Sequence, residues 1–250
     1  MVSCKLMGRL GNQLFQIAAV FGYAMKHNVD FSIPETTLNP KIWKSYFDNL
    51  YKPLPAGQGM YAIYKEPSHA YAEIPLYINV MLDGYFQSYK YFDFCLDKLR
   101  ELFGFDWQLD KKTVAVHVRR GDYLLYPDKH PVVTPEYLYQ AISFFIMHGY
   151  KHFVFYSDDI GWCMELEKPW VRGIDYGYSE NKSEEEDLMM MSCAEHQIIS
   201  NSSYSYWAAM LNRNKDKIII APSVESWFGP ANKHLDTSTM CPPEWKRLNF

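Results

Sequence analysis

The chain has 250 residues, which is enough for one large domain or two smaller ones with a sizeable core. Apolar residues make up 48% and charged residues 22%, the balance of a globular protein, and the formal net charge of -4 gives no basic surface for nucleic acid. No apolar run reaches the roughly 18 residues of a membrane span, so none is predicted.

The N-terminus has no basic region followed by an apolar run, so we expect no signal peptide. Five cysteines are scattered with no paired spacing, which predicts reduced thiols and no metal site. We therefore expect a cytoplasmic protein, in which the glycosylation sequon at 201–203 is inert.

The first half of the chain predicts strands and helices joined by irregular chain. In order, we expect a strand at 2–6, a glycine turn at 8–12, a buried helix at 13–26, strands at 29–33 and 78–82, and a helix at 88–103. Residues 34–75 contain six prolines and predict loops and short helices. The polar stretch 104–112 breaks the pattern and predicts a domain junction.

The second half alternates strands and helices more regularly. We expect strands at 114–118, 152–156, 171–174, 197–200 and 217–221, and helices at 135–148, 184–194 and 204–212. Thr134 before Pro135 predicts one helix N-terminus, and Ser183 with Glu186 predicts a capping box at the next. Because the strands are continuous apolar runs, the pattern predicts an α/β fold with a parallel sheet covered on both faces.

Polar side chains follow three of these strands. Arg119 and Arg120 follow the first, Asp158 and Asp159 the second, and the loop 201–203 a third. Ligands of open α/β sheets bind outside the carboxyl ends of the strands. The three clusters therefore favour a nucleotide site over a solvated edge.

The arginine pair has two interpretations. It can form a surface ion pair with Asp122, which would contribute little stability. It can also bind a diphosphate, because guanidinium groups donate parallel charge-assisted hydrogen bonds to phosphate oxygens. In that case the Arg-Gly-Asp tripeptide at 120–122, an adhesion signal in some extracellular proteins, is a by-product of the motif.

The chain resembles the α1,2-fucosyltransferase family in five blocks that occur in the family's order. They are GRLGNQLFQ at 8–16, GYFQS at 84–88, HVRRGDY at 117–123, FYSDD at 155–159, and a C-terminal motif of DLMMMS at 187–192 with ISNSSYSYW at 199–207. Residues 34–75 match no block, and because that region often shapes the acceptor side in the family, the acceptor stays open.

The resemblance implies a GT-B fold, with two Rossmann-like halves around a cleft. It implies that residues 1–106 form the acceptor side and residues 107–250 bind GDP-fucose. The reaction would transfer L-fucose to the 2-hydroxyl of a terminal galactose on a glycan, with inversion and without a metal or other cofactor. No Asp-x-Asp motif of metal-dependent glycosyltransferases follows a strand, and the Asp158–Asp159 pair is only a weak rival for that role.

The resemblance also implies roles for residues of the donor half. Arg119 would hold the β-phosphate and neutralise the leaving group, and Arg120 would share that role or brace the loop. His117 is either structural or in contact with the nucleotide. Asp158 would accept hydrogen bonds from guanine, or cap a helix. The loop residues Asn201, Ser202 and Ser203 would bind the donor, with the serines capping a helix, binding phosphate, or both.

Two residues of the glycine turn and one aspartate complete the predicted site. Gly11 would contact the donor, and Asn12 would orient the acceptor or the leaving group. Asp122 would act as the general base, or would instead fix the arginines in place.

Two other classes of function remain open. A nucleotide-sugar-binding protein without turnover would carry the same residues. A different nucleotide-dependent enzyme, such as a methyltransferase, is disfavoured because no Gly-x-Gly-x-x-Gly turn follows the first strand. A fucosyltransferase of different linkage specificity is a third alternative.

Overall fold

The computed structural model describes residues 1–33, 61–103 and 108–250. They form two compact units: Met1–Asp106 with Leu235–Pro242, and Trp107–His234 with Pro243–Phe250. The sequence pattern did not indicate that residues 235–242 belong with the N-terminal part. Among the residues described, no helix is both long and apolar enough to cross a bilayer.

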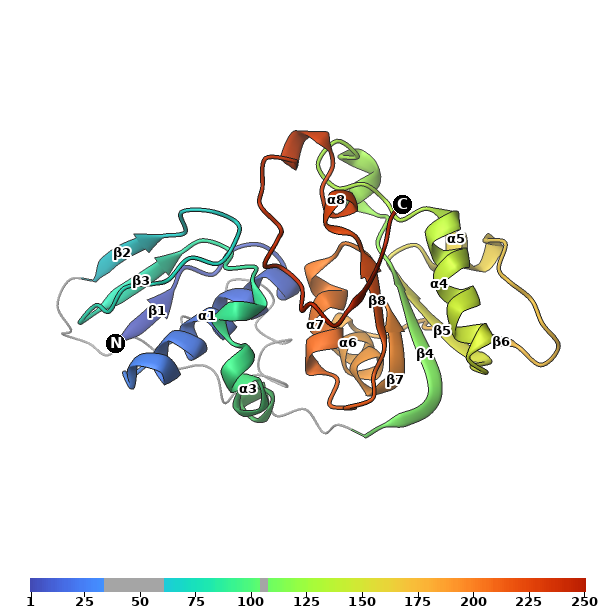
Figure 1. The fold of residues 1–250 in the computed structure, drawn as a ribbon, viewed down its shortest axis with the longest axis horizontal. Helices are drawn as coiled ribbons and strands as arrows, with labels where there is room; N and C mark the ends of the chain where they lie inside the picture. Colours follow the sequence, from blue (N-terminus) through green and yellow to red (C-terminus); the bar gives the residue numbers. More distant parts are fainter. Residues whose placement is uncertain (34–60, 104–107) are drawn as a thin grey trace. The chain divides into compact units, whose positions relative to one another are not determined.

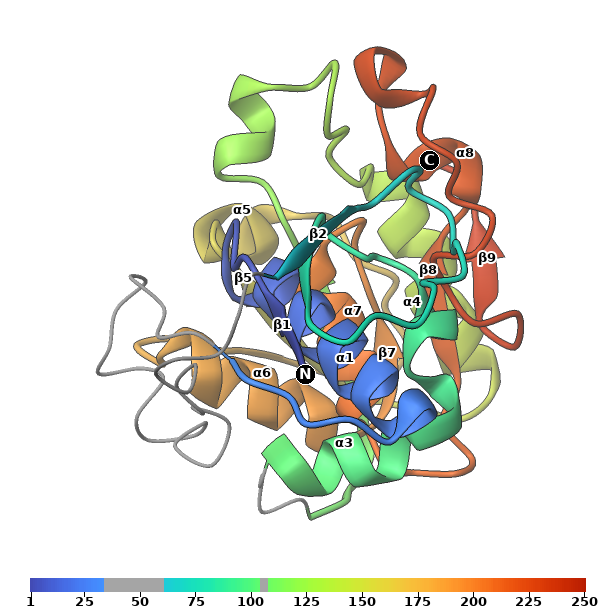
Figure 2. The ribbon, with the colours of Figure 1, turned by 90° about the vertical axis from the view of Figure 1, so that its left-hand side faces the viewer.

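The first unit is built on a parallel sheet with strand order β1-β3-β2 (Figure 1). Its elements are β1 (Val2–Cys4), α1 (Leu10–His27), β2 (Ala62–Lys65), β3 (Val80–Asp83), the 3-10 turns η1 (Tyr89–Tyr91) and η2 (Asp93–Cys95), and α3 (Leu96–Phe103). Helix α1 is buried along most of its length, as its apolar pattern predicts. α1 and α3 lie side by side (Figures 1 and 2).

Four expectations for this unit were wrong in detail. α1 begins at Leu10 rather than at residue 13, because the Arg9 carbonyl already accepts the amide of Gln13. The predicted strand at 29–33 is reduced to an isolated bridge between Val2 and Phe31. Residues 62–65, where we expected loops and short helices, form strand β2 instead. Of the predicted helix at 88–103, only the part from Leu96 is α-helical, since two 3-10 turns precede it.

The second unit contains a six-stranded parallel sheet with order β6-β5-β4-β7-β8-β9. Its strands are β4 (Asp110–Val118), β5 (His152–Ser157), β6 (Asp175–Tyr178), β7 (Ala194–Ile198), β8 (Ile219–Pro222) and β9 (Lys246–Leu248). Its helices are η3 (Asp122–Leu125), α4 (Pro135–Met147), α5 (Ile160–Glu165), α6 (Glu184–Cys193), α7 (Ser203–Leu211), α8 (Val224–Trp227) and η4 (Pro230–Asn232).

The order of these strands is that of a doubly wound Rossmann sheet. The chain moves outward from β4 through β5 to β6, and then returns so that β7 pairs with the other side of β4. Helices α4 and α5 lie on one side of the sheet, and α6 and α7 on the other (Figure 1). The α/β fold class is confirmed: each unit has the parallel sheet expected of a GT-B protein.

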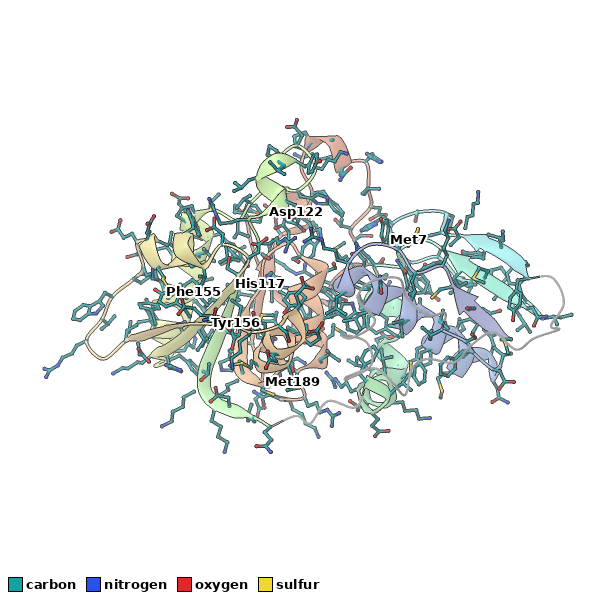
Figure 3. The ribbon with its side chains drawn as sticks, turned by 180° about the vertical axis from the view of Figure 1, so that it is seen from behind. Met7, His117, Asp122, Phe155, Tyr156 and Met189 are labelled. Carbon is teal, nitrogen blue, oxygen red and sulfur yellow. The ribbon has the colours of Figure 1, made fainter. Side chains whose placement is uncertain are left out.

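The two faces of β4 have different partners. Val114, Val116 and Val118 are fully buried in the core that α4 covers. His117, between Val116 and Val118, lies on the other face of the sheet, where its neighbour on the adjacent strand β5 is Tyr156 (Figure 3). The buried polar side chains of β4 are Thr113 and, near the carboxyl end of the strand, His117.

The helix caps are confirmed, and one strand prediction was wrong. The Thr134 hydroxyl accepts the Tyr137 amide, and Ser183 and Glu186 form a reciprocal capping box. The strand expected at 171–174 lies instead at 175–178, because Gly173 adopts a positive φ of 84° and turns the chain before pairing begins.

Candidate functional site

The three polar clusters that follow predicted strands lie at neighbouring strand ends of the second unit. The strands β5, β4 and β7 are adjacent in the sheet and parallel. Their carboxyl ends lead to Asp158, to Arg119, and to Asn201, respectively. The boundary between the paired strands β4 and β7 is the topological switch point, and doubly wound sheets bind their ligands at its carboxyl end.

Arg119 is held by two carboxylates. Its Nε and Nη2 donate to Oδ1 of Asp122 at 3.0 and 2.6 Å, and its Nη1 lies 3.1 Å from Oδ2 of Asp158. The ring of Tyr123 lies 5.7 Å from the guanidinium carbon. These contacts use three of the five N–H groups of the guanidinium and leave one on each terminal nitrogen. The predicted ion pair with Asp122 is therefore present, and two N–H groups of the Arg119 guanidinium remain for a ligand.

Arg120 braces the loop. Its Nε donates to Oδ2 of Asp159 at 2.9 Å, and its guanidinium stacks on Trp162 with 4.1 Å from carbon to ring centroid. Asp159 also caps α5 by accepting the Trp162 amide. Of the two roles predicted for Arg120, the contacts match the brace.

Asp158 fastens the loop of residues 119–121, called the arginine loop from here on, to the end of β5. Its Oδ1 accepts the backbone amide of Arg120 at 2.9 Å, while Oδ2 faces Arg119. The approach is so close that a Cβ on Gly121 would lie 2.3 Å from Oδ2 of Asp158. The alternative role that we gave Asp158, a helix cap, is wrong, because Asp159 occupies the cap. Recognition of guanine by Asp158 stays a prediction.

His117 links the two strands of the switch point. Its Nδ1 lies 2.8 Å from Oγ of Ser200, which follows β7. Burial, and secondly the charge of Arg119, lower the pKa of His117 to about 3, so the imidazole is neutral. Its ring lies 5.4 Å from that of Tyr204 at the start of α7. Both contacts support the structural role, and contact with a nucleotide stays a prediction.

Asn201 connects the arginine loop to the segment after β8. Its side-chain amide donates to the carbonyls of Pro131 and Trp227 at 2.9 and 3.0 Å, and its backbone carbonyl accepts the Tyr123 hydroxyl at 3.1 Å. Burial raises the pKa of Tyr123 to about 12, so its hydroxyl remains a donor. These bonds make Asn201 a positioning residue of this geometry, and the contact with the donor that we expected of it stays a prediction.

Ser202 and Ser203 lie at the N-terminus of α7, as predicted. The Ser202 hydroxyl accepts the Tyr204 amide at 3.3 Å, which confirms its capping role. Helix N-termini present amide groups and a positive dipole that favour phosphate. The predicted binding of phosphate by these serines is compatible with the cap.

One carboxylate near this edge was missed. Asp187, in the first turn of α6, accepts the Ser179 hydroxyl at 2.5 Å, and burial raises its pKa. Burial, and secondly the negative charge of Asp187, raise the pKa of Tyr204, whose ring neighbours that of His117. Asp187 lies in the predicted family block 187–192, but only the fold shows which strand ends it approaches.

The glycine turn of the first unit is fixed from within α1. Gly8 has a φ of 75°, and a Cβ there would lie 2.5 Å from Nδ2 of Asn12. The buried side chain of Gln16 bonds both the amide and the carbonyl of Met7, and Gln13 donates to the Gly8 carbonyl at 3.0 Å. The predicted turn residues Gly11 and Asn12 lie instead in the first turn of α1, where Gly11 is buried.

Asn12 is hydrogen-bonded to a residue of the family block at 84–88 in this unit. Its Oδ1 accepts from Nε2 of Gln87 at 2.8 Å. Nearby, Glu66 accepts the amides of Tyr85 and Phe86 at 2.7 and 2.9 Å and fixes the turn after β3. Burial raises the pKa of Glu66. Glu66 lies in the region without a family match, so no motif pointed to it.

No trio of histidine, cysteine or acidic side chains suited to a metal ion occurs in residues 1–33, 61–103 or 108–250. The metal independence of the reaction stays a prediction.

Comparison with known proteins decides the family. The model of Glycosyl transferase family 11 matches residues 1–246. The chain belongs to glycosyl transferase family 11. This confirms the resemblance to α1,2-fucosyltransferases that the five blocks indicate.

Three individual proteins illustrate the match. The chain is 33% identical to the alpha-1,2-colitosyltransferase of Escherichia coli over 187 residues, which cover 68% of this chain and 63% of that protein. It is 36% identical to the O-antigen biosynthesis glycosyltransferase WbnK of Escherichia coli over 129 residues, covering 48% and 41%. Arabidopsis thaliana FUT1, solved with GDP, aligns with 91% of this chain and 72% of that chain, with a TM-score of 0.47 and 14% identity, a likeness too low to support an argument. The chain spans less than two thirds of the length of both curated relatives.

Proposed function

We propose that this chain transfers L-fucose from GDP-fucose to the 2-hydroxyl of a galactose on a glycan, with inversion and without a metal. The observation that carries the proposal is the arrangement at the β4–β7 switch point. There Arg119, the N-terminus of α7 and the loop after β5 come from adjacent strand ends. Membership of glycosyl transferase family 11 supplies the reaction class.

Binding of the diphosphate requires Arg119 to change partners or share them. Arg119 and Arg120 contact the three carboxylates of Asp122, Asp158 and Asp159, so the cluster has no surplus positive charge. The Asp122 side chain is 38% exposed and lies on the short turn η3, whereas that of Asp158 is 25% exposed and also bonds the Arg120 amide. We therefore infer that the β-phosphate displaces Asp122 and leaves Asp158 in place.

This exchange would couple donor binding to the base. An Asp122 carboxylate bound to Arg119 has to give up that ion pair before it can accept a proton. Once phosphate replaces it, Asp122 becomes available to take the proton of the acceptor hydroxyl, while Arg119 neutralises the departing GDP. The acceptor oxygen attacks the anomeric carbon from the face opposite the diphosphate, which inverts the configuration. Asn12, in the first unit, would orient the acceptor.

Guanine needs a carboxylate that can accept from its N1–H and exocyclic amine. Both oxygens of Asp158 already contact the arginine loop. Asp187 accepts a hydrogen bond from Ser179, and its charge acts on Tyr204, whose ring lies 5.4 Å from that of His117. Asp187 is therefore a second candidate beside Asp158 for recognition of the base.

A second donor is favoured by one comparison. The relative matched over most of this chain is named for transfer of colitose. Colitose is fucose without its 3-hydroxyl, so the two donors place the same diphosphate and anomeric carbon in a site. Turnover with GDP-fucose and GDP-colitose, compared at equal concentration, decides between them.

The experiment that tests the proposed function is GDP release from GDP-fucose across a panel of β-galactosides, with and without excess EDTA. We expect release that depends on the acceptor and persists in EDTA. Tight binding of GDP-fucose without release on any acceptor would instead show a nucleotide-sugar-binding protein. Loss of release in EDTA, restored by magnesium or manganese, would refute metal independence.

A further inference from the structure

Glu66 lies directly after strand β2, beside the turn that follows the neighbouring strand β3. Its backbone amide donates to the Asp83 carbonyl at 3.0 Å, so it continues the pairing of the two strands by one residue. Its Oε2 accepts the Tyr85 amide at 2.7 Å, and its Oε1 accepts the Phe86 amide at 2.9 Å. Each oxygen of the carboxylate therefore holds one backbone amide of the turn.

The fit between Glu66 and this turn is close. A Cβ on Gly84 would lie 2.3 Å from Cβ of Glu66 and 2.6 Å from its Oε2. The turn can approach Glu66 in this way only because residue 84 has no side chain. Gly84 is the first residue of the family block at 84–88, so a glycine of that block has its steric partner in the region that matches no block.

The backbone of the turn is strained at Phe86. Its φ of 53° lies in the left-handed region, which bulky residues rarely adopt. Such a conformation persists only where the surrounding structure fixes it. Here the ring is fully buried in an edge-to-face contact with Tyr91, at 5.4 Å between centroids, and the amide is bound by Glu66. The contact with Glu66 therefore supports a backbone conformation that is unfavourable by itself.

The conformation of Phe86 sets the direction in which the next residue, Gln87, leaves the turn. Nε2 of Gln87 donates to Oδ1 of Asn12 at 2.8 Å. This bond fixes which end of the Asn12 amide is the acceptor, and it leaves Nδ2 on the side of the glycine turn, where a Cβ on Gly8 would lie 2.5 Å from it. The orientation of Asn12 is therefore set before an acceptor binds, with Nδ2 as the end that can donate to an acceptor oxygen.

We propose that Glu66 is a positioning residue of the acceptor side, which holds Asn12 in its working orientation through Phe86 and Gln87. The inference rests on the proposed function, in which Asn12 orients the acceptor. Glu66 acts through the turn and does not itself touch the acceptor. Both of its oxygens are needed, so glutamine at this position, with one acceptor oxygen, would leave one amide of the turn without its partner.

The test compares Glu66→Gln with the native chain in GDP release from GDP-fucose with a lactose-type acceptor. We expect kcat to fall by about 10- to 100-fold, because misplacement of an orienting group by about 1 Å costs up to about 100-fold. KM for GDP-fucose should stay within about twofold, because the donor is proposed to bind the second unit. Glu73→Gln is the matched control: it removes an exposed carboxylate of the same unit, one that binds Lys26 and the Tyr71 hydroxyl, and it should change neither constant. A native kcat in Glu66→Gln, or a loss confined to KM for GDP-fucose, would overturn the inference.

A double-mutant cycle tests whether Glu66 acts through Asn12. Asn12→Ala removes the residue on which Glu66 is proposed to act, so adding Glu66→Gln should change kcat by less than about threefold. Two losses that multiply would overturn the inference. Gln87→Leu, which leaves both contacts of Glu66 in place, should lower kcat as Glu66→Gln does. It tests the same path if Glu66→Gln does not fold, and a native kcat in Gln87→Leu would also overturn the inference.

The side-chain amide signals of Asn12 and Gln87 in an NMR spectrum of the full chain test the coupling without turnover. Glu66→Gln should shift both signals, Glu73→Gln should shift neither, and unchanged signals in Glu66→Gln would overturn the inference. If the native chain releases no GDP with any acceptor, the proposed function fails, whereas this spectrum still decides whether Glu66 controls the orientation of Asn12. Circular dichroism of each variant establishes that a lowered kcat is not a lost fold.

Discussion

Replacement of Arg119 by lysine tests whether a planar fork at the end of β4 is required. Arg119 contacts Asp122 and Asp158 with three N–H groups and has one more on each terminal nitrogen. An ammonium group is a compact point charge and cannot keep the contact with Asp158 while forming the fork's parallel hydrogen bonds to a phosphate. Loss of one donor to developing negative charge costs about 100–1,000-fold in turnover, or about 2.7–4 kcal/mol. We expect turnover of Arg119→Lys to fall by at least about 100-fold.

The assay is GDP release from GDP-fucose with a lactose-type acceptor, accompanied by calorimetric titration of GDP. Arg172→Lys is the matched control, because Arg172 is exposed in the loop before β6. It should leave both measurements unchanged. Turnover of Arg119→Lys within about threefold of the native chain would show that charge alone is sufficient and would refute the proposed role.

Three further predictions concern residues 117–122, at the end of β4 and in the loop that follows it. Asp122→Asn should reduce turnover by at least about 100-fold, because the base is lost. GDP affinity should be maintained or rise, because the residue that competes with phosphate for Arg119 has lost its charge. Weaker GDP binding in calorimetry would instead favour a purely structural role for Asp122 in holding Arg119. Gly121→Ala should lower the free energy of unfolding by about 1–3 kcal/mol, because its Cβ would displace the Asp158 carboxylate, and an unchanged denaturant midpoint would contradict that packing. His117 has a pKa of about 3 when folded and about 6.5 when unfolded, so its contribution to stability is complete above pH 6.5 and is lost as the pH falls towards 3. His117→Asn should therefore reduce the acid dependence of unfolding by up to about 1.4 kcal/mol per pH unit, and equal slopes for both chains would refute a buried neutral His117.

The sequence predicted the helix ends that are set by side chains of the same helical turn. Thr134 and Ser183 start helices because their hydroxyls satisfy amides within the same turn. Strand β2 was missed because it is a short, largely exposed edge strand, whose four residues carry no apolar alternation. β9 was missed for a related reason: the polar sequence Lys246–Leu248 becomes a strand only because β8 offers a free edge.

The sequence also predicted that three polar clusters would meet, since parallel strands end at one edge. It could not predict how the carboxylates would be distributed. Asp158 and Asp159 are adjacent in sequence, yet one bonds the Arg120 amide and the other caps α5. The bond between His117 and Ser200 depends on β7 pairing with β4 across the switch point, which no local pattern specifies.

The proposed reaction is transfer of fucose to the 2-hydroxyl of galactose with inversion. The most direct measurement is to incubate the chain with GDP-fucose and a lactose-type acceptor and assign the product by NMR. We predict a fucose joined through an α-linkage to the 2-hydroxyl of the galactose. A linkage to another hydroxyl would contradict the regiochemistry, a β-linkage would contradict inversion, and the absence of any fucosylated product would contradict the account as a whole.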